Sequence, residues 1–206
     1  GYFFEAHEIL SKIKADADKL NVHNKTIFYV NYITNLVKCK FYKEALHTLE
    51  NEFTIENALY KNMLLYNRLL CYLFLRDTKN LATYITYDLD AAPFPQNYML
   101  KMIKSAYFYL IGEYETALSV INSLLQAKSS SDNMQYYQPV ATIFKRLYTV
   151  SQKNSLQKRW SEKDIKSLQD GINEFEETAP PEFKLVSTYL WIKDEIELNL
   201  IKKHSS

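Results

Sequence analysis

The segments KFYKEALHTL (residues 40–49) and GEYETALSVI (residues 112–121) share one pattern, and that pattern decides the fold. In both, a tyrosine precedes an alanine by three residues, and aliphatic residues follow about one turn later. Residues 1–10 fit the same frame, and residues 77–86 fit it with a lysine in place of the aromatic residue. The four alanines are 39, 37 and 35 residues apart, at Ala6, Ala45, Ala82 and Ala117. This spacing predicts a repeat of helix pairs, in which a small residue lets two helices approach closely.

Apolar residues recur at intervals of three and four along almost the whole chain, which is the periodicity of amphipathic helices. Glycine is scarce, with 3 in 206 residues, so tight hairpins and phosphate-binding loops have little support. The composition therefore disfavours Rossmann, P-loop and most all-β architectures. We expect helices at about 3–19, 24–39, 41–53, 57–75, 78–89, 95–111, 114–127, 134–152, 161–177 and 181–203.

The residues between these helices predict where some of the helices begin and which segments are not helical. Ser161 and Asp164 stand in the order Ser-x-x-Asp and predict a capping box at the start of helix 161–177. Pro181 suits the first turn of the next helix. Residues 91–95 contain two prolines and are expected to be extended, whereas residues 129–133 read as a polar loop.

The elements Tyr42-x-x-Ala45 and Gly112-x-Tyr114-x-x-Ala117, each preceded by an aromatic-rich helix, resemble the tetratricopeptide repeat family. The resemblance covers about residues 1–127, and the repeat is longer than the ~34 residues of that family. It implies an all-α, right-handed superhelix of about ten helices in a single α-solenoid domain, residues 1–206. Residues 1–127 would form the helix pairs, and residues 128–206 a divergent C-terminal repeat with capping helices.

Signatures of catalysis are missing from the sequence. It contains no Gly-x-Ser-x-Gly, no Gly-x-Gly-x-x-Gly and no phosphate loop, and no two of its 4 histidines are three or four residues apart. Cys39 and Cys71 lie in apolar helical patterns and are expected to be buried thiols. With 25 basic and 24 acidic residues, the net charge of +1 offers no overall field for nucleic acid. We therefore expect no catalysis, no cofactor, no metal site and no nucleic-acid partner.

The resemblance also implies a binding surface, because the first helix of each pair lines the concave groove in tetratricopeptide proteins. Asparagine amides on that face could hold a peptide backbone through both a donor and an acceptor. The basic–asparagine–basic set that holds a C-terminal carboxylate in some members is absent, since Val30 and Thr34 occupy two of its positions. An apolar or aromatic-lined groove for a protein or peptide is expected at Asn31, Thr34, Asn67, Arg68, Cys71, Met102 and Tyr109.

Three functions stay open at this point. The first is a non-catalytic scaffold, either cytoplasmic or tethered to a membrane through upstream sequence, since no apolar stretch of the chain itself is long enough to span one. The second is the peptide-sensing part of a bacterial transcription regulator whose N-terminal helix-turn-helix is absent here, an analogy at the level of the fold. The third is an enzyme with dispersed residues, to which no sequence feature points. The usage of Lys, Asn, Ile and Tyr suggests an AT-rich bacterial gene. The sequence does not indicate an oligomeric state.

Overall fold

The fold is all-α over the residues that the computed structural model describes, which are 2–17, 19–51, 58–85, 95–127, 134–155 and 160–204. Eleven helices occur in these ranges and pack against one another, and no strand occurs in them. The expected all-α class is therefore confirmed. The expected segments 91–95 and 129–133, and the ends of helices 41–53 and 78–89, lie mostly or wholly outside the described residues.

The chain divides into two compact units, residues 1–96 and residues 97–206. The sequence predicted a single domain in which the recognisable helix pairs end at residue 127, and that position lies inside the second unit. Each unit has its own buried core.

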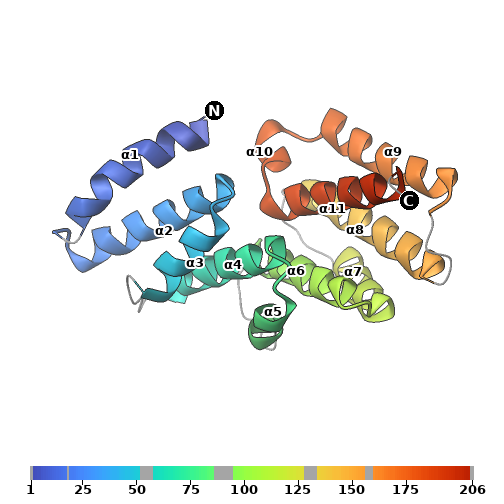
Figure 1. Cartoon of the computed structure of the whole chain (residues 1–206), viewed down its shortest axis with the longest axis horizontal. Helices are drawn as coiled ribbons and strands as arrows, with labels where there is room; N and C mark the ends of the chain where they lie inside the picture. Colours follow the sequence, from blue (N-terminus) through green and yellow to red (C-terminus); the bar gives the residue numbers. More distant parts are fainter. Residues whose placement is uncertain are drawn as a thin grey trace. The chain divides into compact units, whose positions relative to one another are not determined.

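The first unit stacks its helices in chain order. Its elements are α1 (Tyr2–Ala17), α2 (Val22–Lys38), α3 (Tyr42–Asn51), α4 (Ala58–Phe74) and α5 (Thr78–Ile85). Helix α1 packs beside α2, helix α3 contacts both α2 and α4, and α5 packs on α4 (Figure 1). Helices α2 and α4, which are the first helices of the pairs α2–α3 and α4–α5, also contact each other.

Aliphatic residues of α2 and α4 form the centre of this unit. Ile33 and Leu36 from α2 and Leu69 and Leu73 from α4 are completely buried. Burying one such side chain stabilises the folded state by about 1.5–3 kcal/mol. Helix α1 buries less, because Ala17 is inaccessible but large apolar residues on another side of the helix stay exposed.

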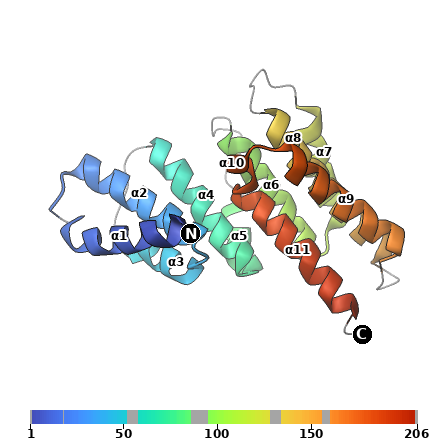
Figure 2. The ribbon, with the colours of Figure 1, turned by 90° about the horizontal axis from the view of Figure 1, so that it is seen from above.

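The second unit is built around one long helix. Its elements are α6 (Gln96–Leu110), α7 (Tyr114–Gln126), α8 (Met134–Asn154), α9 (Glu162–Thr178), α10 (Pro181–Lys184) and α11 (Ser187–His204). Helix α8 packs against α7, α9 and α11, and α11 also contacts α9 (Figure 2). Helix α6 joins this core through Ser105, whose hydroxyl lies 3.0 Å from that of the fully buried Tyr148.

One backbone turn recurs in both units and sets the period of the chain. Helices α2, α4 and α6 each end before a residue with positive φ, and these residues are 36 positions apart: Lys40 (63°), Arg76 (56°) and Gly112 (84°). The amide after each of them donates to a carbonyl five residues earlier, as Phe41 does to Leu36 at 2.9 Å. Together with a second bond from the positive-φ residue itself, this is a Schellman turn.

The recurring turn corrects the repeat frame that the sequence suggested. The amides of Ala45, Leu81 and Ala117 hold equivalent positions, because each donates to the residue that directly follows the left-handed one. All three side chains are fully buried. Leu81 therefore replaces Ala82, which is only half-buried, as the residue at the third helix crossing. The sequence pattern placed the third repeat one residue too late, because it was aligned on an alanine. The position of the turn shows that Leu81 is the equivalent residue.

The predictions for the last helices have mixed outcomes. The capping box is confirmed, since the Ser161 hydroxyl accepts from the Asp164 amide and the Asp164 carboxylate accepts from the Ser161 amide. Pro181 begins a helix, as expected. The single helix expected at 181–203 was wrong, because it is interrupted between Lys184 and Ser187. There the Leu185 and Val186 amides donate to residues three positions earlier, and Phe183 packs its ring on Tyr136 of α8 at 4.3 Å between ring centroids.

The residues with positive φ in the Schellman turns give the first prediction. A Cβ added at Gly112 would meet no atom within 4 Å, so Gly112→Ala introduces only the strain of a left-handed residue. We expect it to lower the free energy of unfolding by about 1 kcal/mol, and Lys40→Gly to raise it by about 0.5 kcal/mol. Urea unfolding followed by circular dichroism measures both. Gly112→Asn is the control, because asparagine tolerates positive φ and should cost less than alanine. Equal stability of the alanine variant and wild type would contradict the assignment.

Candidate functional site

The structure places the residues of the groove predicted from the sequence at different depths. Asn31 is exposed, while Thr34 and Arg68 are half-buried. Asn67 and Tyr109 are buried, and Cys71 and Met102 have no accessible surface. A side chain without accessible surface contributes to the core and not to a groove.

The polar members of that set connect helices of the first unit. The Asn67 amide donates to the Thr34 hydroxyl at 3.0 Å and so links α4 to α2. The Arg68 guanidinium donates to the Leu49 carbonyl at 3.1 Å and to the Tyr84 hydroxyl at 3.2 Å. It also lies 5.2 Å from the centroid of the Tyr84 ring, in cation–π geometry. Arg68 therefore joins the ends of α3 and α5 to α4.

Tyr109 belongs to a buried polar cluster of the second unit. Its hydroxyl donates to Oε1 of Glu195 at 3.2 Å, and the Asn199 amide donates to the same carboxylate oxygen at 3.1 Å. Burial, together with the charge of Glu195, raises the pKa of the Tyr109 hydroxyl well above its ordinary value. The hydroxyl therefore stays protonated as a donor, and the cluster fixes α11 on α6.

The two cysteines are buried thiols, as the sequence predicted. Burial raises the pKa of Cys71 to about 12, so its thiolate is scarcely populated at neutral pH. The Cys39 thiol donates to the Phe3 carbonyl at 3.2 Å, and burial raises its pKa as well. Neither sulfur is placed or ionised to act as a nucleophile.

An open groove of about 500 Å³ lies on the second unit, between α7 and α9 with α8 as its floor. Apolar side chains alternate in it with amides, hydroxyls and two charged groups. The lining residues are Leu125, Gln135, Gln138, Pro139, Thr142, Ile143, Arg146, Gly171, Glu174, Phe175 and Thr178. A second hollow of about 520 Å³ continues from Arg146 towards the end of α8 and the start of α9. We call the two hollows together the α8–α9 groove.

Arg146 lies between the two hollows because Gly171 leaves room for it. A Cβ at Gly171 would come within 2.6 Å of Arg146 Nη1. In the absence of that Cβ, Nη1 donates to the Ser167 carbonyl at 3.3 Å, and Nη2 lies 3.9 Å from the Glu174 carboxylate. The guanidinium is thus held flat against α9, with part of its surface open to solvent.

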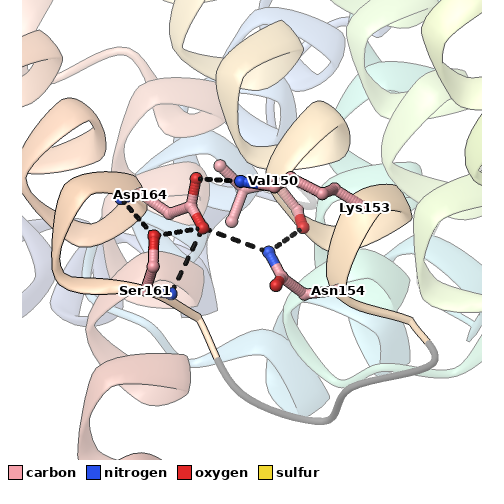
Figure 3. A network of polar contacts seen from close by, with 5 residues as sticks. All are labelled: Val150, Lys153, Asn154, Ser161 and Asp164. Carbon is pink, nitrogen blue, oxygen red and sulfur yellow. Dashed lines mark hydrogen bonds and ion pairs between the residues drawn. The ribbon is translucent and has the colours of Figure 1, made fainter.

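A polar network ties the α9 wall of the groove to the end of α8 (Figure 3). The Asp164 carboxylate accepts from the Ser161 hydroxyl at 2.7 Å, and from Asn154 and Lys153 at 3.3 Å each. These bonds, that from Ser161 above all, lower the pKa of Asp164 to about 2. The carboxylate is ionised throughout the physiological range, which keeps the start of α9 fixed.

The sequence did not predict the α8–α9 groove, because most of its residues lie beyond the recognisable repeats. The sequence did contain one signal, which is a glycine within the amphipathic segment 161–177. Glycine inside a helix costs about 1 kcal/mol relative to alanine, so its presence there indicates that another group approaches closely.

Within the described ranges, no group of three or more His, Cys, Asp or Glu side chains could hold a metal ion. Among the same residues, no helix is both long enough and apolar enough to cross a membrane. No protein-family model, curated protein or solved structure matches the chain.

The Asp164 network gives a prediction about pH. Because the pKa of Asp164 is lower in the folded chain than the ordinary 3.8, its ionised form stabilises the fold above about pH 4. That contribution is lost as the pH falls towards 2. We expect Asp164→Asn to lower the free energy of unfolding at pH 7 by about 1 kcal/mol, as for other helix-capping groups. Urea unfolding at about pH 7, 4 and 2 should show that the difference in unfolding free energy between wild type and variant becomes smaller as the pH falls. A difference in unfolding free energy that is the same at every pH would contradict the stabilising role of the ionised Asp164.

Proposed function

We propose that the chain is a non-catalytic scaffold of the tetratricopeptide kind, a right-handed superhelical array that binds a protein or peptide partner. The observation that carries the proposal is the α8–α9 groove, which is open on a unit with a well-buried core. Its volume lies in the usual range of ligand sites, about 300–1,000 Å³.

The lining of the groove suits a polypeptide. Leu125 and Pro139 are half-buried and supply apolar contacts, while Gln135 and Gln138 each carry an amide that can both donate and accept. A peptide needs both kinds of contact, because its side chains seek apolar surface and its backbone groups need hydrogen-bond partners. The helix pairs with their recurring turn support the scaffold part of the proposal, since stacked pairs present extended binding surfaces.

Substitution of a threonine inside the groove tests the proposal. Thr142 lines both hollows, and its hydroxyl donates to the carbonyl four residues earlier at 3.0 Å. Thr142→Arg would fill the groove with a long side chain. We expect it to weaken binding of peptides selected from a displayed random library at least about tenfold, which is 1.4 kcal/mol.

The matched control is Thr83→Arg, on α5 of the first unit. Thr83 is exposed, and its hydroxyl makes the same kind of bond to the carbonyl four residues earlier, at 3.4 Å. Asn31→Arg tests the face that the sequence predicted. Loss of binding in Asn31→Arg alone would move the site to that face. Failure of the wild-type chain to enrich any peptide over a bare matrix would contradict the function.

A further inference from the structure

The charges around the α8–α9 groove are uneven. Lys145 on α8 and Lys163 on α9 line the second hollow. Lys163 and Lys166 line a third hollow of about 430 Å³, which adjoins the α8–α9 groove at Arg146 and Ser167. All three are exposed, and none of their ammonium groups makes an ion pair or hydrogen bond among the described residues. With Arg146, which lines all three hollows, they place four cationic side chains along the surface formed by α8 and α9.

The acidic residues nearby do not balance this charge. Asp164 already accepts hydrogen bonds from Lys153, Asn154 and Ser161. Glu174 faces Arg146 at 3.9 Å, and Asp170 makes no ion pair within the described part of the chain. Among the carboxylates that line the hollows, Asp164 is paired with Lys153 and Glu174 faces Arg146, so Asp170 is the one that has no ion pair in the described ranges. The hollows are lined by four cationic and three acidic side chains, and Lys153 adds a fifth cation beside Asp164, so cations are in excess around this surface.

Apolar surface lies between these cations. Leu125 and Val150 line the same hollow as Lys145 and Lys163, together with the methyl groups of Thr142 and Thr149. A ligand that uses the whole surface therefore needs carboxylates next to apolar side chains. We infer that the α8–α9 groove takes an acidic segment of a protein partner, with apolar residues interspersed among its Asp and Glu. This inference rests on the proposed function and names the class of peptide.

Nucleic acid is the other polyanion that four cations could attract, and the groove fits it less well. Single-stranded nucleic acid is commonly held by bases that stack on exposed aromatic rings. The aromatic residue that lines the groove, Phe175, is only 2% exposed. Asp170 and Glu174 line the hollow around Lys163 and Lys166 and would repel a row of phosphates, whereas a peptide can place its carboxylates at the lysines alone.

The test compares two charge-reversal variants of the full chain. The groove variant carries Lys145→Glu, Lys163→Glu and Lys166→Glu. The control carries Lys12→Glu, Lys43→Glu and Lys61→Glu, at exposed lysines of the first unit that make no ion pair in the described ranges. Both variants have the same net charge, so a general effect of charge acts equally on them.

The readout is the composition of peptides that each protein enriches from a displayed random library, followed by affinity measurements on the enriched peptides. We expect wild type and control to enrich Asp and Glu together with apolar residues. We expect the groove variant to bind those peptides at least about tenfold more weakly, and added salt to weaken wild-type binding.

Each other outcome is decisive. Enriched peptides without excess Asp or Glu, bound equally by the groove variant, would overturn the inference and leave the proposed function in place. No enrichment by wild type would overturn both. A single-stranded oligonucleotide that binds wild type more tightly than any enriched peptide, and loses binding in the groove variant, would replace the acidic peptide by nucleic acid.

Discussion

A pair of backbone hydrogen bonds around one left-handed residue sets the geometry on which the helix pairs depend. The bonds close at Lys40, Arg76 and Gly112 and reverse the chain within three residues. The residue after each turn also caps the next helix, because its carbonyl accepts the amide four positions on. The second helix of a pair thus begins at a fixed place, and Ala45, Leu81 and Ala117 point into the core. Two of these turns use residues other than glycine, so the fold accepts a strain of about 1–2 kcal/mol at each.

The helical class and most helix positions could be predicted because they depend on local patterns. Apolar periodicity locates a helix, and the Ser161–Asp164 capping box locates the start of α9 to the residue. The frame of the third repeat could not be found in this way, because Leu81 fills the place of an alanine and Arg76 that of a glycine. The break at Leu185 also escaped prediction, since it accompanies a contact between Phe183 and Tyr136, about 50 residues apart in sequence.

Much less of the candidate site than of the fold could be predicted from the sequence. Asn67, Arg68 and Tyr109 stood out as polar residues in apolar helices, and the structure gives each of them partners inside the fold. A sequence cannot distinguish a polar side chain that awaits a ligand from one that binds a neighbouring helix, because both need a partner when buried. The α8–α9 groove contains the opposite kind of contact, in which Gly171 provides space and Arg146 occupies it. Such a pair, 25 positions apart, is recognised only once the helices are placed side by side.

Because the two thiols are buried, their chemical reactivity reports local opening of the structure around them. Both cysteines belong to the first unit, and the second unit has none. Each thiol is enclosed and has a raised pKa, so a thiol-specific alkylating reagent reacts only with molecules in which that part of the structure has opened. The rate of alkylation, followed by mass spectrometry, therefore times the opening of the first unit separately from any event in the second. A cysteine introduced on an exposed helix face of either unit could be labelled selectively while the native pair stays unmodified.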